Sequence, residues 1–308
     1  MKREARIRHY MGKAYDQTMV VDSSQIPAYL LRYSQRERMK GNNTSTYYVM
    51  DMERHVQRTG LHHAEFLFYD RDRVEPFDLP TLVKSRPLQD HGQSILFNLN
   101  SRRHFGNVCL LPHKDTLPYH QKRDALIWRG SDTGYGFGND IPPRDTSRET
   151  LVQRFHTSSS PHLDIGLSGL VNQSQSPHHA TRYSAYLKPS LSLKEMLQYK
   201  MVLCVEGNDV ASGLKWVLAS TCLPVCPPPT MESWIMEGHL EPYTHYLPVR
   251  SDFSDVEEKV EWALGHPQLC EDMVKAGQHY MKPFQDVKEE NAITTEILRR
   301  YHQNVRFL

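Results

Sequence analysis

Short apolar runs and helical patterns alternate in the second half of the chain. Residues 201–205 (MVLCV) form a continuous apolar run with the length of a buried strand. A turn at 206–209 (EGND), a helical pattern over 210–219 and a second apolar run at 223–226 follow in that order. Strand, helix and strand in this order predict a βαβ unit, and therefore a parallel sheet covered by helices.

The same pattern reading places further elements on both sides of this unit. Apolar runs predict strands at 64–69, 94–99 and 125–128. Helix starts are indicated near Ser147, at Pro267, and at two capping boxes, Ser192 with Glu195 and Ser254 with Glu257. Ile293, Ile297 and Tyr301 recur at helical spacing and predict a last helix. The first 60 residues are polar and weakly patterned.

Composition narrows the classes of protein. The 308 residues are enough for two domains, and 39% hydrophobic residues can form a core. A formal net charge of +1 lacks the basic excess of a nucleic-acid binder. No apolar run approaches the roughly 20 residues of a membrane helix, and the basic N-terminus lacks an apolar signal core, so we expect a cytoplasmic protein. Five scattered cysteines do not form a disulfide framework.

Two loops follow predicted strands and lead into predicted helices, at 129–139 and 206–212. Such junctions expose backbone N–H groups where an anion is favoured, and glycine lets a phosphate approach closely. Arg129, Arg148 and Lys215 are cations that could offset a diphosphate. The weaker interpretation is an ordinary turn with solvated charges, because glycine and arginine are common at such places.

The literal sequence strings add to this reading. Residues 199–216 (YKMVLCVEGNDVASGLKW) resemble the signature of glycosyltransferase family 90, closest to its lipopolysaccharide type. Further blocks are similar to the family and arrive in family order: 80–86 (PTLVKSR), 122–131 (KRDALIWRGS), 148–152 (RETLV), 231–237 (MESWIME), 245–248 (HYLP) and 252–255 (DFSD). The resemblance covers roughly residues 64–285.

The resemblance implies an α/β fold of the GT-B type, with two Rossmann-like domains facing across a cleft. We expect an acceptor-side domain at 1–119, to which a C-terminal helix at 286–308 packs back, and a nucleotide-sugar-binding domain at 120–285. It also implies an inverting transfer from a UDP-sugar to a glycan hydroxyl, with no cofactor and no essential metal. The donor sugar stays open among glucose, xylose and galactose.

Inversion needs a general base that deprotonates the acceptor hydroxyl. The family's base is an Asp at a strand end before the Lys-x-Arg stretch, so the resemblance makes Asp70 the first candidate and Asp72 the second. The alternative is an acid in a solvated turn. Lys84, Arg86, Glu232 and His245 fall in the family blocks and are expected near the site. For His245, a core histidine bonded to backbone is at least as good an interpretation.

Donor binding falls to the loops of the second domain. The residues expected there are Trp128, Arg129, Gly130, Ser131, Thr133, Arg148, Glu206, Gly207, Asn208, Asp209, Ser212 and Lys215. Trp128 also fits a buried strand position in the core. The animal members of the family carry an Arg shortly before the helix lysine, and here residues 212–215 read SGLK, which leaves open which cation holds the phosphates.

Two other functions compete. Asp70-Arg71-Asp72 is a D-x-D string, the pattern that holds a divalent metal on the donor in another class of glycosyltransferase. The chain could also be a non-catalytic module that binds a nucleotide or sugar. The 17 histidines show no metal-type pairing, and Cys222 with Cys226 is too isolated for zinc.

Overall fold

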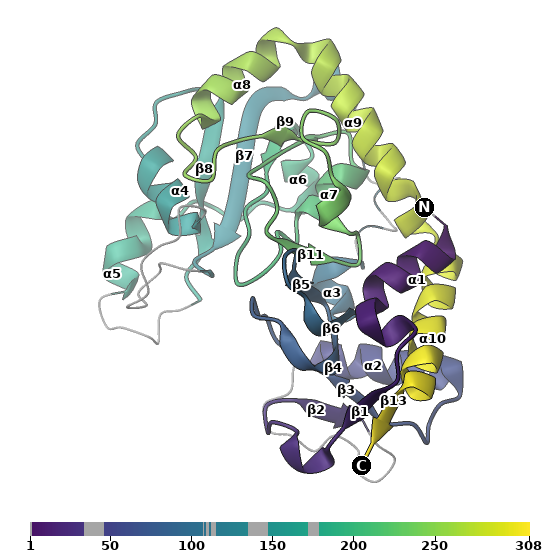
Figure 1. Ribbon diagram of the computed structural model, residues 1–308. Coiled ribbons are helices and arrows are strands. Elements are labelled where there is room, and N and C mark those ends of the chain that lie inside the picture. The colour runs from purple at the N-terminus through teal and green to yellow at the C-terminus, as the bar shows by residue number, and fades with distance from the viewer. Residues whose placement is uncertain are drawn as a thin grey trace. The chain divides into compact units, whose positions relative to one another are not determined.

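The computed structural model describes residues 2–33, 46–106, 108, 111, 115–134, 147–171 and 179–308. The chain forms two compact units, which we describe separately. Unit 1 comprises residues 1–109, 230–238 and 283–308, and unit 2 comprises 110–229 and 239–282. Both mix helices with parallel strands, so the fold is α/β (Figure 1). Unit 1 thus includes residues 230–238, which the predicted boundaries put with 120–285.

Unit 2 contains one five-stranded sheet in the order β12-β10-β9-β7-β8, and every neighbouring pair is parallel. Its strands are β7 (Arg123–Ser131), β8 (Leu163–Gly169), β9 (Tyr199–Leu203), β10 (Leu223–Cys226) and β12 (Leu247–Pro248). Its helices are α4 (Arg148–Phe155), α5 (His179–Tyr183), α6 (Leu193–Met196), α7 (Leu214–Ala219), α8 (Val256–Gly265) and α9 (Pro267–Met281). The predicted βαβ unit is β9-α7-β10, and its two strands are parallel as expected.

The core of unit 2 explains why these segments fold as they do. Apolar side chains of β7, β8, β9 and β10 pack against the apolar faces of α4, α8 and α9. A parallel strand covered by helices is apolar along most of its length, and this produces the continuous runs seen in the sequence. β7 is longer than the predicted 125–128 because it pairs with β8 on one side and with β9 on the other.

Two predicted helix starts in unit 2 are wrong. The helix predicted from residue 210 begins at Leu214, because Gly207 N–H donates to Asp209 O and 207–213 stays in bends and turns. The capping box at Ser254 and Glu257 does not form. Asp255 is the N-cap of α8 without a side-chain bond, and Glu257 accepts from Ser158 Oγ instead. The box at Ser192 and Glu195 is confirmed in α6.

Unit 1 is built on a four-stranded sheet in the order β2-β3-β4-β6, in which β3, β4 and β6 are parallel and β2 is antiparallel. These strands are β2 (Leu31–Tyr33), β3 (Phe66–Phe68), β4 (Phe77–Val83) and β6 (Gly92–Leu96). Two smaller sheets pair β5 (Ser85–Pro87) with β11 (Met231–Ser233), and β1 (Met19–Val21) with β13 (Val305–Phe307).

The helices of unit 1 are α1 (Arg3–Met11), α2 (Thr46–Thr59), α3 (Ser101–His104) and α10 (Val287–Asn304). The long C-terminal helix α10 packs against α1 and α2 (Figure 1). Its predicted residues Ile293, Ile297 and Tyr301 are all buried, which confirms the apolar face read from the sequence. Within the described residues, no helix combines the length and apolar character that crossing a membrane requires.

Candidate functional site

The sheet of unit 2 has a switch point between β7 and β9. From β7 the chain passes to β8 on one side, and then to β9 on the other side of β7. With the strands β7, β8, β9, β10 and β12 numbered 1 to 5 along the chain, their order across the sheet is therefore 2-1-3-4-5, counted from β8 to β12. In open α/β sheets, ligands bind beyond the carboxyl ends of the strands at this reversal. The predicted loops after β7 and β9 both start there.

Arg148 joins these two loops. It is the first residue of α4, whose N-cap Ser147 accepts a hydrogen bond from Thr150 N–H. Nη1 of Arg148 donates to Ser131 O at 3.1 Å and to Thr133 Oγ1 at 2.7 Å, and Nη2 donates to Val205 O at 3.4 Å. A guanidinium held on both strand ends can face an anion at the switch point.

Two glycines let the loops approach each other closely. A Cβ built on Gly207 would lie 2.8 Å from Nη2 of Arg148, and one on Gly134 would lie 3.1 Å from Gly207 O. Gly134 has φ +103°, and its N–H donates to Asn208 Oδ1 at 2.9 Å. Ser131, Thr133, Arg148, Gly207 and Asn208, all predicted as donor residues, therefore come together. Residues 135–139 of the predicted glycine-rich loop lie outside the described residues.

Arg129 lies in a different network. Its Nη2 makes two bonds of 2.9 and 3.0 Å with the carboxylate of Asp164, and its other donors reach carbonyls of Trp128, Asp164 and Pro189. Burial would raise the pKa of Asp164, but Lys188 and Arg129 hold this pKa below its usual range. The guanidinium of Arg129 thus ties β7 to β8, whereas Arg148 ties β7 to β9.

The remaining predicted donor residues differ in exposure. Trp128 is part of the buried core, and a Cβ on Gly130 would lie 2.6 Å from its ring, so glycine makes room for the indole. Glu206 and Ser212 are half-buried. Asp209 is 5% exposed, and Lys215, in the first turn of α7, is 1% exposed. Lysine is almost never buried this deeply unless its ammonium group is paired.

The carboxyl edge of the unit 1 sheet gathers charged residues. Asp70 and Asp72 follow β3, Lys84 follows β4, and His104 ends α3. Lys84 Nζ lies 2.5 Å from Asp72 Oδ1 and 3.4 Å from His104 Nε2, and this lysine side chain is 4% exposed. Asp70 is also buried, with Oδ1 3.8 Å from Arg71 Nε. The ammonium group of Lys84 already balances Asp72.

Arg86 and Glu232 form a buried pair in register between β5 and β11. Arg86 Nε donates to Glu232 Oε1 at 2.8 Å, while its other nitrogens bond the carbonyls of His9, Tyr10 and Ser94. Burial alone would raise the pKa of Glu232, but His9 and Arg86 lower it. These donors and acceptors hold unit 1 together.

His245 also has a structural environment. Its Nδ1 accepts from Glu241 N–H at 3.0 Å, and its ring packs edge-on against Tyr280. Burial lowers the pKa of His245, so the neutral form fits this acceptor role. The bond to backbone matches the structural interpretation of His245, although this residue is half-buried and lies outside the core.

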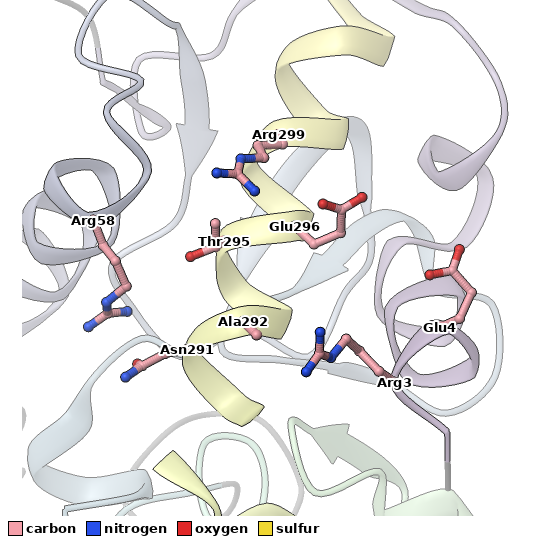
Figure 2. A pocket seen from close by; sticks show the side chains of 8 residues that line it. All are labelled: Arg3, Glu4, Arg58, Asn291, Ala292, Thr295, Glu296 and Arg299. Carbon is pink, nitrogen blue, oxygen red and sulfur yellow. The ribbon is translucent and has the colours of Figure 1, made fainter. Parts of the chain in front are cut away.

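In the part of the chain that the structure describes, His, Cys, Asp and Glu side chains form no group of three that could hold a metal ion. A groove of about 490 Å³ lies over α10, between α1 and α2 (Figure 2). Its lining contains Arg3, Arg58, Thr295 and Arg299, and none of the predicted site residues.

Sequence reasoning missed the partners that arrive from distant parts of the chain. His104 is not among the predicted site residues, yet its contact with Lys84 places it at the edge that carries Asp70. No local motif indicates this contact, because the two residues meet only when β4 and α3 fold onto one sheet edge.

Comparisons with known proteins agree with the motif reading. The O-glucosyltransferase LpsA of Dichelobacter nodosus is 32% identical over 225 residues, which cover 73% of this chain and 62% of that protein. Protein O-glucosyltransferase 2 of Danio rerio is 28% identical over 214 residues, covering 69% of this chain and 36% of that protein. The uncharacterized protein 027R of Frog virus 3 is 30% identical over 194 residues, 56% of this chain and 19% of that protein.

The chain therefore spans about three fifths of the bacterial relative's length and less of the others. The family model described as Glycosyl transferase family 90 matches residues 110–307, which include all of unit 2 and, from unit 1, residues 230–238 and α10. Its match includes the strands of the switch point and the Arg148 cluster. The chain belongs to glycosyl transferase family 90.

Proposed function

We propose that the protein is an inverting glycosyltransferase that moves a sugar from a UDP-sugar to a hydroxyl group of a glycan. The observation that carries this proposal is the Arg148 cluster at the switch point between β7 and β9. A guanidinium, two glycines and loop backbone at this place suit a diphosphate. Membership of the family supports the same donor class. The names of two relatives favour glucose over xylose or galactose.

We further propose the GT-B arrangement, with units 1 and 2 as its two Rossmann-like domains. Parallel strands in each unit support this assignment. In this proposal unit 2 holds the nucleotide-sugar and unit 1 supplies the base. The domain boundaries predicted from the sequence stay a prediction.

In the proposed reaction, a carboxylate of unit 1 takes the proton of the acceptor hydroxyl while the oxygen of that hydroxyl attacks the anomeric carbon of the donor sugar. The bond between this carbon and the diphosphate oxygen breaks, and UDP leaves with the bonding electrons. Arg148 and the loop backbone would stabilise the charge on the leaving diphosphate, which is where preorganised donors contribute most. Asp70 is the first candidate for the base. For Asp72, accepting the proton would require breaking its ion pair with Lys84.

Binding and hydrolysis should be measured across a panel of UDP-, GDP- and CMP-sugars, with and without EDTA. We expect one UDP-sugar to raise the melting temperature and to be hydrolysed slowly, with no effect of the chelator. Loss of activity on chelation would instead favour the metal-dependent class suggested by Asp70-Arg71-Asp72. Binding of a UDP-sugar without turnover on any glycan would favour a non-catalytic module. Binding of no nucleotide-sugar would contradict the proposal.

A further inference from the structure

An exposed aromatic ring lies at the same sheet edge as Asp70. β2 runs antiparallel to β3 with Leu31 opposite Phe68. Tyr29 lies in the turn before β2, and its ring contacts the ring of Tyr69, the residue that precedes Asp70. The rings of Tyr29 and Tyr69 meet edge-on, with centroids 6.2 Å apart at 87°. Tyr29 is 51% exposed, although it is large and mostly apolar.

Contacts with Arg73 and Tyr69 hold the Tyr29 ring in place. The guanidinium of Arg73 lies 5.5 Å from the centroid of Tyr29 and 4.7 Å from that of Phe77. Nε of Arg73 donates to Glu75 O at 3.2 Å, and Tyr69 packs against Phe77 at 5.2 Å. Cation–π and edge contacts fix the orientation of the ring while leaving much of it open to solvent. A ring ordered before binding loses little entropy when a ligand stacks on it.

We propose that Tyr29, supported by Tyr69 and Arg73, is a stacking platform for a sugar ring of the acceptor. A pyranose presents an apolar C–H face, which an aromatic ring covers, and hydroxyl groups, which charged side chains bind. Asp70 and Arg73 supply such charged groups within the same few residues. This inference rests on the proposed function, because it assigns the neutral sugar of that reaction to the edge carrying the candidate base.

Location distinguishes Tyr29 from a second tyrosine with nearly the same surroundings. Tyr243 of unit 2 is 52% exposed, meets the ring of Trp262 edge-on at 6.0 Å, and has Lys259 Nζ 5.5 Å from its centroid. An exposed tyrosine with an aromatic and a cationic neighbour is therefore not enough to indicate a sugar site. Tyr243 lies in a turn of unit 2, whereas Asp70 belongs to unit 1. It provides a matched control.

The test uses the full chain and a printed array of neutral oligosaccharides that end in glucose, galactose, xylose or mannose. The strongest glycan found with the wild type is then titrated by calorimetry against Tyr29→Ala, Tyr29→Phe and Tyr243→Ala. We expect Tyr29→Ala to weaken binding about tenfold, from lost stacking and lost apolar contact. Tyr29→Phe and Tyr243→Ala should bind as the wild type does. Melting temperatures confirm that each variant is folded.

Several results would overturn the platform. They are retention of the glycan by folded Tyr29→Ala, an equal loss in Tyr29→Phe, an equal loss in Tyr243→Ala, and binding of no glycan by the wild type. Titration of the wild type with UDP-glucose separates the two proposals. If glycan binding depends on Tyr29 but the protein binds no nucleotide-sugar, the sugar-stacking role of Tyr29 would stand and the proposed glycosyltransferase activity would be contradicted.

Discussion

Arg148 and Lys84, the cations at the two sheet edges, contact different kinds of oxygen atom. In unit 2, three neutral oxygens of Ser131, Thr133 and Val205 hold the guanidinium of Arg148. In unit 1, the carboxylate of Asp72 holds the ammonium group of Lys84. A neutral oxygen orients a cation without cancelling its charge, whereas a carboxylate does both.

In the proposed function, each edge takes a different ligand. The unit 2 edge binds a diphosphate in that proposal, and two glycines clear the space beside Arg148. The unit 1 edge pairs Lys84 with Asp72 and carries Asp70 and the exposed ring of Tyr29. A carboxylate at this edge suits the removal of a proton from a sugar hydroxyl. Variants at each edge test whether the donor and the acceptor bind at different edges.

The largest effect should come from Asp70. Asp70→Asn keeps the shape of the side chain but cannot accept a proton, so we expect kcat to fall by about 10²–10⁴-fold, the usual contribution of a general base. UDP-sugar affinity should stay within about twofold, because the proposal places the donor at the unit 2 edge. Initial rates with UDP-glucose and calorimetry with UDP measure the two effects.

Asp72→Asn is the matched control for Asp70. It leaves Lys84 without its carboxylate, so a moderate loss through lower stability is expected, and the loss should be smaller than that of Asp70→Asn. A larger loss in Asp72→Asn at equal melting temperature would transfer the role of base to Asp72.

The buried pairs of unit 1 should make its stability depend on pH. Burial raises the pKa of Glu290 from 4.5 to about 7, although Arg6 and Asn98 act against this. The folded state therefore holds this proton more tightly than the unfolded chain does. The stabilisation is present below about pH 4.5 and is lost as pH rises to about 7. Burial also lowers the pKa of His55 to about 4, which costs stability as pH falls from 6.5.

Glu290 and His55 affect stability in opposite directions, so the variant Glu290→Gln is compared with the wild type at each pH. Between pH 4.5 and 7.5 the wild type should lose on the order of 3 kcal/mol of unfolding free energy relative to Glu290→Gln. Urea unfolding at three pH values measures it. Glu289→Gln is the control. Arg3 lowers the pKa of Glu289, so the difference in unfolding free energy between this variant and the wild type should stay nearly constant over the same pH range. A difference that does not change with pH would refute the assignment to Glu290.

Arg148 tests the unit 2 side of the comparison. Arg148→Ala should weaken UDP binding by about 10–100-fold, because hydrogen bonds to charged groups contribute about 1.5–3 kcal/mol. Uridine, which has no phosphate, should bind equally to variant and wild type. Arg154→Ala, near the other end of α4 and 3.9 Å from Asp252, is the control and should bind UDP normally. Equal losses for UDP and uridine would mean that Arg148 only supports the loops.

Local patterns predicted the elements of unit 2 well, and they could not predict how the charges pair. The run at 223–226 is strand β10, and Pro267 opens α9, because apolar runs and a first-turn proline act over a few residues. Arg129 and Arg148 look alike in the sequence, as cations beside a strand end. One binds Asp164 of β8 and the other binds both strand ends of the switch point. Strand order decides this, and strand order depends on contacts between distant segments.

The smallest expected effect concerns Gly207, and it tests how the glycine acts. A Cβ there would lie 2.8 Å from Nη2 of Arg148 and 3.3 Å from Thr133 Oγ1, so Gly207→Ala should displace the end of the guanidinium and weaken UDP binding several-fold. Gly169→Ala is the control, because a Cβ on Gly169 meets nothing within 4 Å. If Gly207 acts only through Arg148, Gly207→Ala should cause no further loss when added to Arg148→Ala. Additive losses would mean that the backbone at Gly207 contacts the diphosphate itself, and that the anion site is made by the loop as much as by the arginine.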